Sequence, residues 1–134
     1  MKYNEFLSRV QQEAELNSPE EAETIARATL ETLGERVSRT DRHNLGAQLP
    51  NEIKEILFKR DPGEKYTLEE FYSRIAARTG LRFKKAVHQT RAVGDVLREA
   101  VSEGELKYIL RDLPDDYAEI FGKPPEDPGS PSAV

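Results

Sequence analysis

The sequence predicts an all-α fold in which two tandem four-helix repeats pack into one compact helical domain about a pseudo-twofold axis. Three observations predict it. Apolar residues recur at helical spacing along most of the 134-residue chain, no segment shows the two-residue alternation of a half-buried strand, and the two halves of the chain resemble each other. The number of Cys residues is zero, which excludes a disulfide framework and a cysteine nucleophile.

The similarity between the halves follows a nearly constant register. The segment FLSRV at 6–10 matches FYSRI at 71–75, and, after the register drops by one position, segment 22–57 matches segment 86–121. About eleven of the thirty-six positions in the longer block are identical. We therefore expect a first helical repeat over 1–59, a connector over 60–66, and a second repeat over 67–121 that shares its core with the first.

Four helices are expected in the first repeat. The apolar residues of segment 3–14 predict an amphipathic helix. A serine and a proline at 18–19 supply an N-cap and a first helical residue for a long helix that ends near Val37. A short third helix carries Leu45, and Pro50 begins a fourth. The stretch around the connector contains proline and glycine, which break the helical pattern.

The second repeat follows the same plan. A capping box at 67–70 begins it, and the expected helices lie near 68–79, 84–101, 103–112 and 114–121. Residues 122–134 are rich in proline and nearly without apolar side chains. This composition is typical of a disordered tail.

Several motifs of the chain, taken in order, are similar to those of a known family. They are YNEFL at 3–7, LETLGERVS at 30–38, QLP at 48–50 and LREAVS at 97–102. The chain resembles, from residue 1 to about residue 121, the bacterial and archaeal proteins grouped as domain of unknown function 2267. The resemblance implies a small helical cytoplasmic protein. That family has no assigned catalytic or binding residues, so none is carried over.

Composition excludes several classes of protein. No apolar run is long enough for a transmembrane helix, and the acidic N-terminal segment does not resemble a signal peptide. The absence of Cys fits a reducing compartment, so we expect a cytoplasmic protein. The net charge of −5 disfavours a nucleic-acid partner without excluding one.

No catalytic constellation is found in the sequence. It lacks the glycine-rich motifs that bind nucleotide phosphates and the motif of a serine nucleophile. The only two histidines, His43 and His88, lie at non-equivalent positions of the two repeats and have no ligand-type neighbours at metal-binding spacing. We expect no metal site, no cofactor and no enzymatic activity.

One basic segment distinguishes the second repeat from the first. No acidic residue occurs between Glu70 and Asp95. The basic residues specific to this repeat, and candidates for binding an anion or a partner, are Arg78, Arg82, Lys84 and Lys85. Their counterparts in the first repeat are Glu13, Asn17, Glu20 and Glu21. The segment is a solvated basic face, the partner of the acidic corner of repeat one within or between chains, or a site for an anionic ligand.

Apolar residues on the short helices provide a second set of contact candidates. They are Tyr108, Tyr117 and Phe121. The alternative is that these side chains complete the core between the repeats. Together the two sets favour a non-enzymatic helical interaction module that binds itself or a protein partner. The alternative function is nucleic-acid or polyanion binding through the basic residues, and an enzyme with a cleft between the repeats is the least favoured.

Overall fold

The computed structural model describes residues 1–121, and the predicted disordered tail over 122–134 lies outside the described residues. The described chain consists of helices without any strand, so the all-α prediction is confirmed. The α-helices are α1 (Tyr3–Glu13), α2 (Pro19–Arg36), α3 (Arg39–Gly46), α4 (Asn51–Leu57), α5 (Leu68–Thr79), α6 (Phe83–Ala100) and α7 (Glu103–Arg111). A 3-10 helix, η1, spans Asp115–Phe121.

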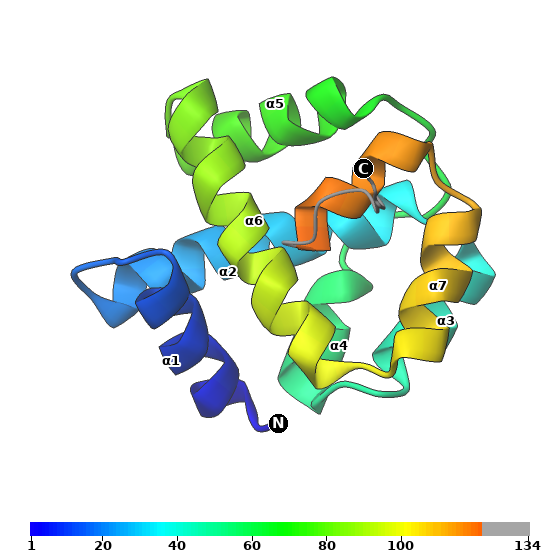
Figure 1. Ribbon diagram of the computed structural model, residues 1–134, viewed down its shortest axis with the longest axis horizontal. Coiled ribbons are helices and arrows are strands. Elements are labelled where there is room, and N and C mark those ends of the chain that lie inside the picture. Colours follow the sequence, from blue (N-terminus) through cyan, green and yellow to red (C-terminus); the bar gives the residue numbers. More distant parts are fainter. Residues whose placement is uncertain (122–134) are drawn as a thin grey trace, which may run out of the picture.

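The two longest helices, α2 and α6, organise the fold (Figure 1). Each has 18 residues, and the two pack against each other. Helix α1 packs on both of them, and so does α5. Helix α4 packs on α2, while η1 packs on α6. The short helices α3 and α7 contact each other on a separate side of the molecule.

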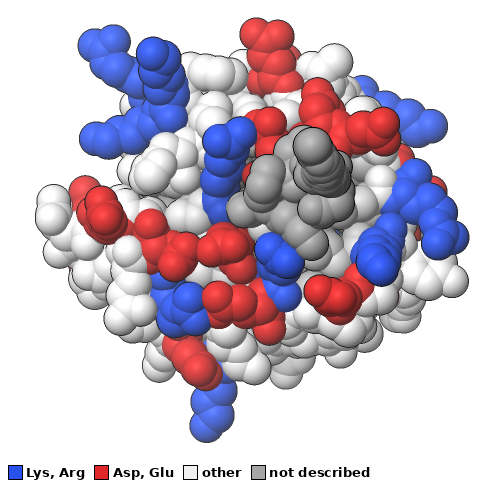
Figure 2. All heavy atoms as spheres, in the orientation of Figure 1, with Lys and Arg blue, Asp and Glu red and all other residues white. Residues whose placement is uncertain are grey.

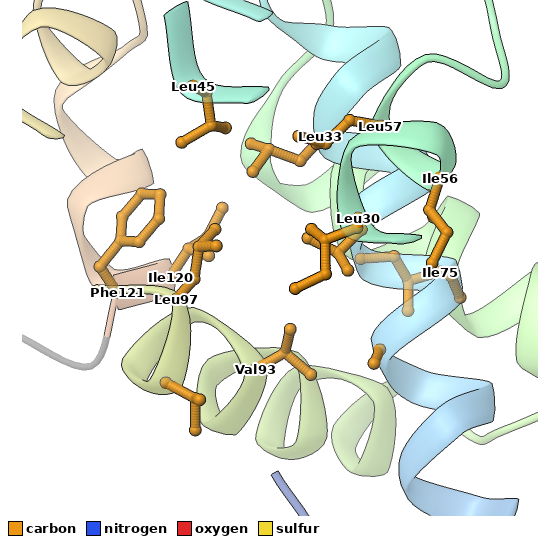
Figure 3. Packing of buried hydrophobic residues seen from close by; sticks show 14 of the residues in the cluster. Leu30, Leu33, Leu45, Ile56, Leu57, Ile75, Val93, Leu97, Ile120 and Phe121 are labelled. Carbon is orange, nitrogen blue, oxygen red and sulfur yellow. The ribbon is translucent and has the colours of Figure 1, made fainter. Parts of the chain in front are cut away.

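A single hydrophobic core joins these helices. Figure 3 shows Leu30 and Leu33 of α2 facing Val93 and Leu97 of α6, with Phe121 of η1 beside them. All five side chains are fully or almost fully buried. Burial of a side chain of this size contributes about 1.5–3 kcal/mol relative to its exposure to water. Since the core draws on both halves of the chain, residues 1–121 form one compact domain.

Two glycines allow helix backbones to touch. A Cβ atom at Gly34 of α2 would lie 1.9 Å from the carbonyl oxygen of Leu57. At Gly94 of α6 it would lie 1.8 Å from the carbonyl oxygen of Ile120. Neither distance is compatible with a side chain, because the contact atom belongs to the backbone. Glycine is therefore required where α4 approaches α2 and where η1 approaches α6.

The expected helix starts are largely confirmed. The side chains of Ser18, Ser38, Thr67 and Ser102 each accept a hydrogen bond from the amide three residues later, at 3.0–3.2 Å. Such a cap contributes about 1 kcal/mol. Two details differ from the prediction. Pro50 is the N-cap of α4 and not its first helical residue, and the last segment forms a 3-10 helix.

Asp41 of α3 is a buried carboxyl group, with only 6% of its surface exposed. Burial and the neighbouring carboxyl group of Asp112 raise the pKa of Asp41 to about 6. The folded state therefore holds this proton more tightly than the unfolded chain, in which the pKa of an aspartate is about 3.9. Ionisation of Asp41 consequently destabilises the fold.

The substitution Asp41→Asn is expected to remove this part of the pH dependence of stability. The stabilisation by protonated Asp41 is fully present below about pH 4 and is lost as the pH rises through about 6. The free energy of unfolding of the Asn variant, minus that of the wild type, should be about 1–2 kcal/mol larger at pH 8 than at pH 4. This value is smaller than the full pKa shift implies, because solvent reaches part of the site. Urea unfolding at both pH values measures the change, and a pH-independent difference would contradict it.

Candidate functional site

Three of the four predicted basic residues form an exposed corner at the junction of α5 and α6. Helix α5 ends at Thr79, and the C-cap residue Gly80 adopts a left-handed conformation with φ of 78° that lets the chain turn back. Helix α6 then begins with Arg82 as its N-cap residue and Lys84 and Lys85 in its first turn. The side chains of these three basic residues are exposed. We call Arg82, Lys84 and Lys85 the basic corner.

The charges of the basic corner are not neutralised by the described part of the chain. No carboxylate of residues 1–121 lies within 4.0 Å of these cations. In the view of Figure 2, basic side chains project from the end of the molecule where Figure 1 places the turn between α5 and α6. Two lysines in a first helical turn oppose the helix dipole by about 0.3–1 kcal/mol each. Their position therefore has an electrostatic cost that helix formation does not explain.

Arg78 does not belong to the basic corner, contrary to the sequence-based grouping. One of its Nη groups donates to Thr32 Oγ1 at 2.8 Å, and the other donates to both carboxylate oxygens of Glu35 at 3.2 Å. The Arg78 side chain is only 19% exposed. Its charge is thus compensated inside the contact between α2 and α5.

Glu35 is the centre of a buried ionic network that sequence reasoning missed. Its carboxylate accepts hydrogen bonds from Arg78, from Arg74 at 3.1 Å and from the hydroxyl of Tyr66 at 2.8 Å. Burial raises the pKa of Glu35, but the hydrogen bonds from Arg78, Tyr66 and Arg74 outweigh it, so the pKa lies below its usual value. The sequence does contain a signal for part of this network, because Arg74 and Arg78 are four residues apart and therefore lie on one face of α5.

An acidic segment lies beside the basic corner. Glu20 and Glu21 in the first turn of α2 are exposed. Together with Lys85 of the basic corner they line a groove of about 260 Å³ whose wall includes Thr79 and Leu81. Within residues 1–121, no ion pair shorter than 4.0 Å closes this groove. The fold thus places charges of both signs side by side on one face without pairing them.

The apolar contact candidates divide into two groups. Tyr117 and Phe121 are 0% and 2% exposed, so the expectation that they are exposed contact residues is wrong. They complete the core, and the Tyr117 hydroxyl donates to the carbonyl of Tyr66 at 2.6 Å. Tyr108 of α7 is 60% exposed and remains a contact candidate. The guanidinium of Arg111 lies 5.0 Å from the centre of its ring.

The described residues provide neither a group of metal ligands nor a membrane-spanning helix. Among residues 1–121, no three or more His, Cys, Asp or Glu side chains are grouped so as to hold a metal ion. His43 and His88 are exposed on α3 and α6 respectively. None of the described helices combines the length and the apolar character that crossing a membrane requires.

Comparison with known proteins supports the resemblance seen in the sequence. Residues 3–120 match a family described as an uncharacterized conserved protein, DUF2267. This match covers nearly all of the described chain. No curated protein matches the sequence. The chain belongs to the DUF2267 family.

Proposed function

We propose that this protein is a non-enzymatic helical interaction module that associates with a second copy of itself through the face carrying the basic corner and Glu20 and Glu21. The observation that carries the proposal is the juxtaposition of these exposed charges without an ion pair among residues 1–121. Charges of opposite sign on one face are self-complementary under a twofold axis. In such a dimer Lys84 and Lys85 of one copy face Glu20 and Glu21 of the other, and the reverse contact forms as well.

The expected dimer is weak and sensitive to salt. Exposed ion pairs contribute about 0–1 kcal/mol each, and salt at physiological concentration screens them over about 8 Å. Phe83, which lies between the basic residues in the first turn of α6, is 42% exposed and is the large apolar side chain nearest to them in the sequence. Electrostatic complementarity of this kind fixes orientation more than it raises affinity.

The tandem repeat belongs to the same proposal, since it explains why an acidic and a basic corner are related positions. Its support is the spacing of the elements: one constant shift along the sequence separates the starts of α2, α3 and α4 from those of α6, α7 and η1, and nearly the same shift separates α1 from α5. The packing is also reciprocal, because α1 packs on α6 and α5 packs on α2. The copies differ where glycine contacts the last helix, since Gly94 lies one helical turn earlier in α6 than Gly34 lies in α2.

A cytoplasmic location is proposed too, supported by the absence of Cys.

Sedimentation velocity at low and high salt tests the association. The wild type should form dimers at about 20 mM salt and dissociate at about 500 mM, since the Debye length falls severalfold across this range. The double substitution Lys84→Glu and Lys85→Glu should abolish the dimer. A matched control reverses two exposed lysines outside the face, Lys59→Glu and Lys107→Glu, and should retain it. A wild type that is monomeric at low salt and high concentration would refute self-association.

A polyanion such as a nucleic acid is the second candidate partner. In its favour, the N-terminus of α6 lacks a side-chain cap, so amide groups of its first turn are available beside Lys84 and Lys85. Helix N-termini with nearby cations are suited to phosphate. Fluorescence anisotropy with labelled single-stranded and duplex oligonucleotides at low salt discriminates between the two. Binding that the Lys84 and Lys85 reversals abolish, by a chain that stays monomeric, would replace self-association by this second function.

A further inference from the structure

A second cavity lies on the side of the molecule where the end of α2, α3 and the end of α7 meet. Its volume is about 250 Å³, and it is independent of the proposed interaction face. Pockets for drug-sized ligands have about 300–1,000 Å³, so this cavity fits a smaller molecule. The residues that matter for its chemistry are Arg36, Val37, Asp41, Lys65, Asp112 and Leu113.

One wall of the cavity carries a buried cation without an ionic partner. Arg36 is 7% exposed, and no carboxylate of residues 1–121 lies within 4.0 Å of it. Its Nε donates to the carbonyl of Tyr66 at 2.8 Å and to the hydroxyl of Tyr117 at 3.0 Å. Neither Nη group donates a hydrogen bond to the described chain. The guanidinium also lies over the rings of Tyr117 and Tyr66, at 5.0 and 5.7 Å from their centres. These rings and the two acceptors occupy its faces and its Nε, so the edge with the Nη groups is suited to an anion. Lys65, exposed at the same cavity, adds a second positive charge.

The same cavity is also lined by two carboxyl groups. Asp41 is more than nine-tenths buried, and its Oδ2 accepts no hydrogen bond from residues 1–121 while both Asp41 and the neighbouring Asp112 are ionised. Asp112, its acidic neighbour, also lines the cavity. Buried polar atoms in native proteins are almost always hydrogen-bonded. An unpartnered acceptor beside a second carboxyl group is suited to a donor with positive charge, such as an ammonium group.

We propose that this cavity binds a small zwitterion, a molecule with an ammonium and a carboxylate group such as a free α-amino acid. Asp41 and Asp112 bind the ammonium group. The Nη groups of Arg36 and the ammonium of Lys65 bind the carboxylate, for which the planar fork of a guanidinium is well suited. The side chain of the ligand lies against Val37 and Leu113, both of which are buried apolar residues, and the volume favours a short aliphatic side chain.

The two buried charged side chains of the cavity do not neutralise each other. Arg36 and Asp41 line one cavity but form no ion pair with each other within 4.0 Å. A molecule with charges at both ends satisfies both walls at once. A ligand with one charge satisfies only one wall and leaves the other unpartnered, which disfavours its binding. The two walls therefore select for a zwitterion over its singly charged analogues.

Isothermal titration calorimetry with the full chain tests the proposal. The probes are the twenty free amino acids at up to about 10 mM. For each that binds, the matched controls are its decarboxylated amine and its deaminated acid. At least one amino acid with a short apolar side chain should bind, and both of its controls should bind at least about tenfold more weakly, because each lacks one charge-assisted contact. Calorimetry of Asp41→Asn and Lys65→Gln should also show affinity reduced about tenfold or more.

Two variants and one control test whether an amino acid binds in this cavity. Lys65 is exposed, so Lys65→Gln probes the site without changing a buried side chain, and circular dichroism checks that both variants fold. Lys107→Gln changes an exposed lysine that does not line the cavity and should leave the affinity unchanged. If none of the twenty amino acids binds, the proposal is wrong. Binding that the folded variants leave unchanged, or that either singly charged control matches, would also overturn it.

Discussion

Replacing Gly34 or Gly94 by alanine is expected to destabilise the fold by about 3 kcal/mol or more. The new Cβ atom would lie less than 2 Å from a backbone carbonyl oxygen of α4 or η1. Overpacking against movable side chains costs typically about 1–3 kcal/mol, and here a backbone segment must shift. Alanine is more favourable than glycine in a helix by only about 1 kcal/mol, which does not offset this cost. Chemical denaturation of each single variant measures the loss.

Gly104 provides the matched control for this prediction. It lies in α7, and nothing outside its own helix lies within 4 Å of the position of a Cβ atom. Gly104→Ala should therefore be neutral or stabilising by up to about 1 kcal/mol. The account of helix packing would be contradicted if Gly34→Ala and Gly104→Ala changed the free energy of unfolding equally.

Glu35→Gln is expected to cost about 3 kcal/mol. The substitution removes a negative charge shared by Arg74 and Arg78. Arg74 keeps its pairs with Glu64 and Glu70, whereas Arg78 then has no anionic partner within 4.0 Å in the described chain. Leaving a buried charge unpaired costs about 3–5 kcal/mol, and the partial exposure of the two arginines reduces this value. Because the pKa of Glu35 is lowered, its contribution is complete above the unfolded pKa of about 4.3 and is lost as the pH falls through the folded pKa.

Two comparisons isolate the role of the network. Glu23→Gln removes the partner of Arg27 in an exposed pair and should cost no more than about 0.5 kcal/mol. In the Glu35→Gln background, Arg78→Met should cost much less than in the wild type, because the uncompensated charge is removed with it. Urea unfolding of the wild type, the two single variants Glu35→Gln and Arg78→Met and the double variant forms a double-mutant cycle, and additive effects of the two substitutions would argue against the network.

Most of the helices could be predicted from the sequence because their signals are local. The caps at Ser18 and Thr67 and the apolar spacing within each segment depend on residues a few positions apart. The expected long helix near 84–101 is observed as Phe83–Ala100. The 3-10 form of η1 was not predictable in this way. It packs on α6 at Gly94, so its geometry depends on a contact with a residue distant in the sequence.

The candidate site was predicted less completely, for a similar reason. Charge counting along the chain found Lys84 and Lys85, which are exposed, but it grouped them with Arg78, which pairs with Glu35 across two helices. The burial of Tyr117 likewise depends on residues distant in the sequence, since its hydroxyl donates to the carbonyl of Tyr66 and its ring centre lies 5.6 Å from that of Phe71. Residue type and spacing identify the charges. Only the tertiary packing decides which of them remain unpaired.

A charge-swap experiment tests the proposed association most directly. One variant carries Glu20→Lys and Glu21→Lys, and the other carries Lys84→Glu and Lys85→Glu. Glu21 also accepts a hydrogen bond from the amide of Asn17, so circular dichroism must first confirm that the first variant folds. Each variant alone should be monomeric in sedimentation velocity at low salt. The equimolar mixture should form a dimer, because both reciprocal contacts are again of opposite charge. A mixture that remains monomeric, with a dimeric wild type under the same conditions, would contradict the proposed face.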